Sequence, residues 1–171
     1  MPSKETWWCY NAHTISSTKP TTNKVNGYAK IFYKWNTKAD GTGTYYDPDD
    51  SNSNTIPRAD TSATINLYAI WKYNFIYEPD SNCNETSTAI SRVEPGKSLK
   101  IPSKFTHKSD AAYDYEIDYY IAGNKKYYVG TSYTLTDDVK AKVHWKQKEK
   151  EYAVKYNANT SDSSVKGIPD T

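Results

Sequence analysis

The stretch that decides the fold is INLYAIWK, residues 65–72. Its apolar residues occupy alternate positions, which is the period of a β-strand with one buried face. A second stretch, VKAKVHWK at residues 139–146, repeats this alternation and ends on the same Trp-Lys pair. Each stretch therefore predicts a strand that closes a structural unit, and the recurrence indicates an internal repeat.

Two further pairs of stretches recur in the same order along the chain. WCYNAHT (8–14) aligns with VKYNANT (154–160), and FIYEP (75–79) is a weaker copy, so all three predict opening strands. Glycine-containing turns precede a Tyr-Tyr pair at 41–46 and again at 123–128, which is typical of hairpins.

These matches predict two tandem modules, residues 5–72 and 73–147. Residues 148–171 then form the opening strand of a third repeat, or a strand that pairs with a neighbour.

The composition favours small, mainly β modules. Aromatic residues make up 15% of the chain, with 17 tyrosines and 5 tryptophans against one methionine, so most of the apolar mass lies in rings. No window shows a sustained helical stripe of apolar residues, so at most one short helix per module is expected, at residues 60–63 and 103–112.

Four stretches carry a resemblance to a known family: FYKWNT (32–37), DGTGTY (40–45), LYAIW (67–71) and YAVKYNAN (152–159). Together they are similar to the internalin-type B-repeat, also called the Listeria–Bacteroides repeat, whose pattern runs Phe-x-Gly-Trp, a glycine turn, and Leu-Tyr-Ala-x-Trp. The second module departs from this pattern, with Tyr119 and Tyr120 where a tryptophan is expected. The resemblance implies a β-grasp-like module, α+β with little helix, that serves as a spacer, partner-binding or adhesive unit on secreted or cell-surface bacterial proteins. It implies no catalytic residues.

The residues that enzymes use are sparse in this chain. The three histidines, His13, His107 and His144, accompany neither a Gly-x-Ser-x-Gly motif nor a Cys-His signature, and His144 is expected to face solvent. Cys9 is expected to be buried in an opening strand, and it shows neither disulfide-framework nor metal-ligand spacing with Cys83. We therefore predict a protein that is not an enzyme and needs no cofactor.

Carboxylates alternate with apolar residues at 113–119, where Asp114, Glu116 and Asp118 share one predicted strand face. The simplest interpretation is that these acids face water while Tyr113, Tyr115, Ile117 and Tyr119 face the core.

Two ligand sites are conceivable from the residue types. Exposed aromatics can stack on the apolar faces of sugar rings, and the candidates for such a platform are Tyr45, Tyr46, Tyr127 and Tyr128. Asp47, Asp49 and Asp50 offer oxygen ligands of the kind that Ca²⁺ takes, but without the EF-hand glycine and glutamate, so a flexible polar loop is favoured.

Charge and hydropathy exclude some partners. The net charge is +2 with both signs interleaved, which predicts no nucleic-acid binding, and no stretch is apolar enough for membrane insertion. The start of the chain lacks the apolar core of a signal peptide, so an extracellular or cell-surface location would make the chain a fragment of its parent, while a virion or intracellular location stays open.

The leading functional hypothesis is a non-enzymatic spacer, adhesion or protein-interaction module. One alternative is a carbohydrate-binding module that uses exposed Tyr and Trp. Another is a subunit of a fibre or virion that assembles through its C-terminal strand, with Tyr152, Val154 and Tyr156 as the pairing residues.

Overall fold

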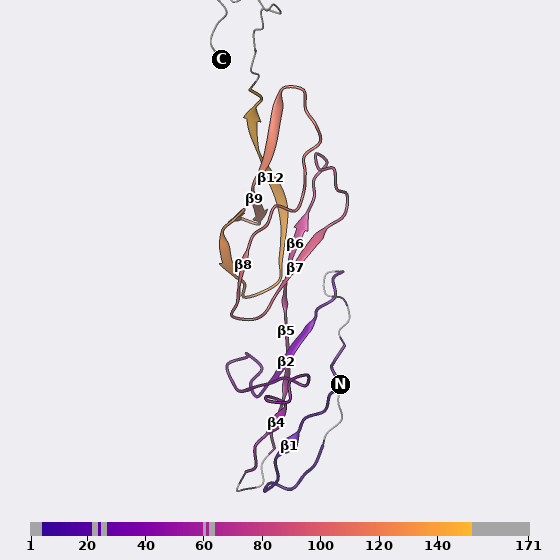
Figure 1. The fold of residues 1–171 in the computed structure, drawn as a ribbon, viewed down its shortest axis with the longest axis vertical. Helices are drawn as coiled ribbons and strands as arrows, with labels where there is room; N and C mark the ends of the chain where they lie inside the picture. Colours follow the sequence, from indigo (N-terminus) through magenta and orange to yellow (C-terminus); the bar gives the residue numbers. More distant parts are fainter. Residues whose placement is uncertain (1–4, 22–23, 25–26, 60, 62–63, 152–171) are drawn as a thin grey trace, which may run out of the picture.

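The computed structural model describes residues 5–21, 24, 27–59, 61 and 64–151 (Figure 1). This part of the chain contains twelve strands in several sheets and no helix, which confirms a mainly β protein. Figure 1 shows the strands of the first half, which we define as residues 5–71, and those of the second half, residues 73–150, end to end along the longest axis.

The first half contains two small sheets. β2, β3 and β5 form a three-stranded antiparallel sheet in the order β3-β2-β5, and β1 pairs with β4. Four buried residues, Ile15, Trp35, Tyr46 and Ile56, form its core. The strands are β1 (His13–Thr14), β2 (Phe32–Asn36), β3 (Tyr45–Tyr46), β4 (Thr55–Ile56) and β5 (Tyr68–Trp71).

The second half is built on a five-stranded mixed sheet in the order β10-β9-β12-β6-β7, with β6 and β12 parallel at its centre. A two-stranded sheet of β8 and β11 accompanies it. Its core contains twelve buried residues, with Phe75, Tyr77 and Tyr120 among them. The strands are β6 (Tyr73–Glu78), β7 (Ala89–Val93), β8 (Ser98–Lys100), β9 (Tyr113–Ala122), β10 (Lys125–Tyr128), β11 (Ser132–Thr134) and β12 (Val139–Glu149).

The two halves share one three-stranded antiparallel motif, β3-β2-β5 in the first and β10-β9-β12 in the second. Trp35 lies between Tyr46 and Ala69 in the first motif, as Tyr120 lies between Tyr127 and Val143 in the second.

Both motifs also contain a register shift at the same place. In β2 the extra residue is Tyr33, which lies opposite the peptide between Ile70 and Trp71 of β5. In β9 it is Asp118, which lies opposite the peptide between His144 and Trp145 of β12. Trp71 and Trp145 therefore occupy equivalent places, as the alignment predicts, although only residues 68–71 of the first closing stretch form a strand. The two predicted hairpins are present.

The opening strands differ between the halves. Residues 75–78 of FIYEP lie in β6, as predicted, and β6 pairs with the closing strand β12. WCYNAHT does not form the predicted strand, because the N–H of Asn11 donates to the carbonyl of Trp8 at 3.0 Å and closes a turn. Only His13–Thr14 is a strand, and it pairs with β4 instead of β5.

The short helix predicted at residues 103–112 is wrong. This segment is irregular, because two of its backbone N–H groups find partners in distant parts of the chain: that of Lys104 donates to the hydroxyl of Tyr120 at 2.9 Å and that of Thr106 to Glu85 Oε2 at 2.8 Å. The helix predicted at 60–63 lies outside the described residues, of which only Thr61 belongs to this range.

The predicted alternation of β9 holds only as far as its extra residue. Asp114 and Glu116 are exposed, as expected, and Ile117 is buried. Beyond Asp118 the faces exchange, so Tyr120 enters the core and Tyr119 packs against His144 with ring centroids 4.2 Å apart.

Candidate functional site

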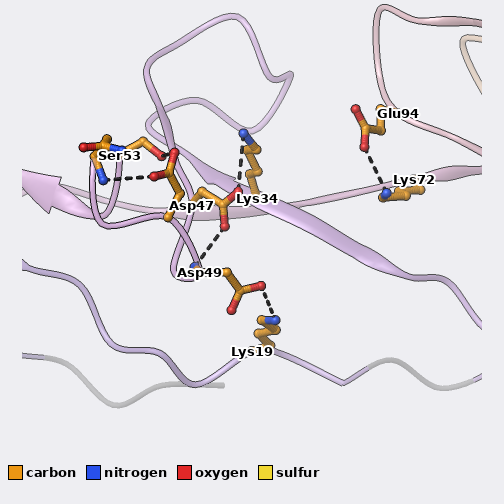
Figure 2. A network of polar contacts seen from close by, with 9 residues as sticks. Lys19, Lys34, Asp47, Asp49, Ser53, Lys72 and Glu94 are labelled. Atoms are coloured by element: carbon orange, nitrogen blue, oxygen red, sulfur yellow. Dashed lines mark hydrogen bonds and ion pairs between the residues drawn. The ribbon is translucent and has the colours of Figure 1, made fainter.

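A single residue, Lys72, separates β5 from β6, so the joint between the two halves contains no linker. The N–H of Lys72 donates to the carbonyl of Ile31 at 2.9 Å, and its ammonium pairs with Glu94 at 3.0 Å (Figure 2). This hydrogen bond from the Lys72 side chain lowers the pKa of the Glu94 carboxyl. Two segments that belong to different halves are therefore held at this point.

Asp138, one residue before β12, connects the halves a second time. Its Oδ1 accepts the N–H of Asn74 at 2.9 Å, and its Oδ2 lies 3.4 Å from the ammonium of Lys30. The side chains of Asp138 and Lys30 are only 14% and 21% exposed. An ion pair this well shielded is screened less by salt than one on the open surface.

Residues 28–30 of the first half lie against the outer face of the second half's sheet. Asn74 and Ile76 are buried although they alternate with Phe75 and Tyr77, which fill the core. The amide of Asn74 donates to the carbonyl of Ala29 at 3.5 Å. Its Oδ1 is buried without a hydrogen-bond partner among the described residues. Such an atom is costly to bury, so Asn74 fits its place only because its other groups are bonded.

The carboxylates of the aspartate loop, residues 47–53, form ion pairs and hydrogen bonds with other groups of the chain (Figure 2). Asp47 pairs with Lys34 at 3.4 Å and Asp49 pairs with Lys19. Asp50 accepts the N–H of Asn52 at 3.0 Å, a bond that lowers the pKa of its carboxyl. The described part of the chain contains no group of three or more His, Cys, Asp or Glu placed to hold a metal ion. The three predicted calcium ligands are thus arranged as turn caps and ion-pair partners.

The four tyrosines predicted to form a platform are not brought together. Tyr46 and Tyr127 are buried in the two separate cores, so their faces are closed to a ligand. Tyr45 packs edge-on against Tyr33, and Tyr128 is 44% exposed on the other three-stranded motif. The predicted pairing residues Tyr152, Val154 and Tyr156 lie outside the described residues.

The three histidines all pack on aromatic rings. His13 stacks on Trp7 at 4.0 Å, and His107 stacks on Tyr115 at 3.7 Å. His144 is exposed, as predicted, and covers one face of Tyr119. These rings support neighbouring aromatics instead of a nucleophile.

The two cysteines are free thiols in different surroundings. Burial raises the pKa of Cys83 to about 11, so it stays protonated at neutral pH. Cys9 is half-buried in the turn at residues 8–11, not buried in a strand as predicted.

A shallow groove of about 630 Å³ lies between residues 103–110 and the ends of β9 and β12. Its aromatic lining includes His107, Tyr115 and Trp145. The nearby ammonium groups are already engaged with backbone carbonyls, Lys108 with Ser81 and Lys150 with Asp110, each at 2.6 Å. These two ammonium groups are therefore not free to bind a ligand in the groove.

One pair of exposed aromatics was missed by the sequence reasoning. Trp8 and Tyr10 are 71% and 64% exposed, and their rings are nearly parallel. The signal in the sequence is their alternate spacing around Cys9, but this spacing also predicts a strand.

Comparison with known proteins gives no relative: no family model, curated protein or solved structure matches the chain. Among the described residues no helix has the length and apolar character needed to cross a membrane.

Proposed function

We propose that this chain is a non-enzymatic repeat region of a secreted or cell-surface bacterial protein, acting as a spacer that carries adhesive or protein-interaction units. The observation that carries the proposal is the joint, in which β5 runs through Lys72 directly into β6. A spacer must hold its ends apart, and two small cores connected without a flexible linker provide this.

The contacts around the joint support a stiff connection. The Lys30–Asp138 pair connects the two halves, the Lys72–Glu94 pair ties Lys72 to the second half, and the backbone bond from Lys72 to Ile31 ties it to the first. Bending at Lys72 would separate these groups and break the contact of the buried Asn74 with Ala29. Since relative motion is the default for domains that touch little, these contacts argue for a rod.

We further propose that the second half is β-grasp-like. In support, its first and last long strands, β6 and β12, lie parallel at the centre, flanked by the hairpins β6–β7 and β9–β10. The crossover that a β-grasp module fills with a helix is here the non-helical stretch 94–112, whose only strand is the short β8. The distant hydrogen bonds to residues 104 and 106 explain why this stretch does not coil.

The test is the spread of distances between the two halves. Spin labels are placed at Ser51 and Ser109, which are exposed and lie in different halves, in a chain with both native cysteines replaced. We expect double electron–electron resonance to give one narrow distribution of the distance between the two spin labels. A chain with Gly-Ser-Gly-Ser inserted after Lys72 is the flexible reference, and a wild-type distribution as broad as this reference contradicts the spacer proposal.

Two variants at Asp138 assign the stiffness to named contacts. Asp138→Asn keeps an oxygen for the N–H of Asn74 but loses the charge that pairs with Lys30, whereas Asp138→Ala loses both. We expect the distribution to broaden more for Ala than for Asn. Glu116→Ala, which removes an exposed ion pair with Lys146 far from the joint, is the matched control and should leave the distribution unchanged.

A further inference from the structure

The turn at residues 8–11 presents the most exposed large aromatic side chains of the described residues. Trp8 is 71% and Tyr10 64% exposed, whereas the next exposed large hydrophobics, such as Tyr128, reach only 44%. The other four tryptophans of the chain are buried or half-buried. Leaving an indole in water forgoes roughly 1.5–3 kcal/mol of burial energy, so an exposed Trp-Tyr pair calls for an explanation other than folding.

The turn is anchored on both sides. The N–H of Asn11 donates to the carbonyl of Trp8 at 3.0 Å, and the N–H of Ala59 donates to the carbonyl of Cys9 at 2.7 Å. The preceding Trp7 packs against the first core and stacks on His13. The backbone is therefore fixed while the two side chains project outward, so a ligand would meet a preformed surface.

The two rings are stacked nearly parallel to each other. Their planes differ by 8° and their centroids are 6.1 Å apart, an offset parallel geometry that leaves most of both faces in water. Such faces match the C–H face of a pyranose ring whose hydroxyls are equatorial, because the C–H groups point at the π-cloud and the hydroxyls stay hydrated.

We infer that Trp8 and Tyr10 form a binding platform for neutral, equatorially substituted pyranoses of an oligosaccharide. The charge around the turn favours a neutral ligand, because Glu5 and Arg58 near it carry opposite charges and neither sign dominates. This site is independent of the spacer proposal and of the four tyrosines predicted from the sequence.

The size of the patch favours a sugar over larger partners. A stable protein interface buries about 800 Å² on each partner, far more than two rings supply. A membrane-surface segment combines a large apolar face with a basic cluster, whereas Glu5 and Arg58 near this turn carry opposite charges. A pyranose, by contrast, has the dimensions of one aromatic ring.

The experiment is titration of the chain with cellohexaose and with chitohexaose, followed by calorimetry and by tryptophan fluorescence. We expect binding with a Kd between about 10 μM and 10 mM and a fluorescence change that is lost in Trp8→Ala. Trp8→Ala and Tyr10→Ala should each weaken binding at least tenfold, and the double variant should abolish it. Tyr128→Ala removes an exposed aromatic elsewhere and should bind as the wild type does.

The outcomes separate the possibilities. No binding of either hexasaccharide at 10 mM overturns the inference, as does binding that survives the double variant. Binding to phosphatidylcholine vesicles that is lost in the double variant, without sugar binding, would show a membrane-surface role instead. Amide NMR spectra of each variant verify the fold, which should be unchanged because both side chains are exposed.

Discussion

In the first half, strand β2 ends on a fully buried polar residue, Asn36, whereas the equivalent position of β9 in the second half is the half-buried Ile121. Asn36 organises the loop that follows: its amide donates to the carbonyls of Gly41 and Gly43, and its Oδ1 accepts the N–H groups of Lys38 and Gly43. All these bonds are 2.8–3.2 Å long. The buried Asn36 side chain, with both its amide and its oxygen hydrogen-bonded, thus holds the loop of the first hairpin, and we call it the Asn36 hub.

In the second half, packing between aromatic rings stabilises the same three-stranded motif. Tyr120 packs edge-on against Tyr77 at 4.8 Å and against Phe75 at 6.4 Å, and its hydroxyl accepts the N–H of Lys104. Burial raises the pKa of Tyr77 and of Tyr120. The β9–β10 hairpin of the second half turns through Gly123 and has no polar side chain in the role of Asn36. The comparison shows that the bulged three-stranded motif, and not one kind of core, is what the halves have in common.

The largest effect is expected from the aromatic core. Phe75→Ala removes a fully buried ring and should lower the free energy of unfolding by about 3–5 kcal/mol, measured by urea denaturation. If the joint couples the halves, a single transition should move. Tyr68→Ala, at an exposed position of β5, is the control. A loss below about 1 kcal/mol would contradict the tight packing of this core.

The next prediction compares the two hairpins through their glycines. A Cβ at Gly43 would lie 2.7 Å from Asn36 Oδ1 and 3.0 Å from the backbone nitrogen of Lys38, so Gly43→Ala should cost about 3 kcal/mol by disrupting the hub. Gly123 has φ 57° and open space around it, so Gly123→Ala should cost only about 1–2 kcal/mol. Equal costs in thermal unfolding would refute the hub.

A smaller effect is expected from pH at the joint. The pKa of Glu94 is lowered in the folded chain, so its contribution to stability is present above the ordinary carboxyl value of about 4.3 and is lost as the pH falls through the folded pKa. Because the Glu94 side chain is 38% exposed, the contribution should stay below about 1 kcal/mol. Between pH 6 and pH 3 the melting temperature of the wild type should therefore fall by up to about 4 °C more than that of Glu94→Gln. An equal fall in both chains would show that this pair does not stabilise the joint.

The last prediction distinguishes the halves without changing their stability. Cys9 is half-buried in a turn, whereas Cys83 is buried with a raised pKa, so a disulfide reagent at pH 7.5 should label one thiol in the native chain and two after denaturation. Cys9→Ser should remove the native reaction. Native labelling of Cys83 would mean that the second half opens locally.

Several features followed from the sequence because their cause is local. The alternation at 139–146, the apolar run within 73–78 and the glycine before the second Tyr-Tyr pair each specify a strand or a turn within a few residues. The acids at 114 and 116 were placed correctly on the solvent face for the same reason. The correspondence of Trp71 with Trp145 was also predicted from the sequence, and the strand pairing confirms it.

Tertiary structure decided the rest, because the deciding partners are distant in sequence. The extra residue Asp118 exchanges the roles of Tyr119 and Tyr120, and only the neighbouring strand fixes its place. Glu85 and Tyr120 hold residues 104–106 in an irregular conformation where the local pattern allowed a helix. The N–H of Ala59 donates to the carbonyl of Cys9 and holds residues 8–11 in a turn where a strand was expected, so Trp8 and Tyr10 form an exposed aromatic pair. Local pattern thus placed strands such as β6 and β12, whereas contacts between distant segments determined where other strands end and which faces they show.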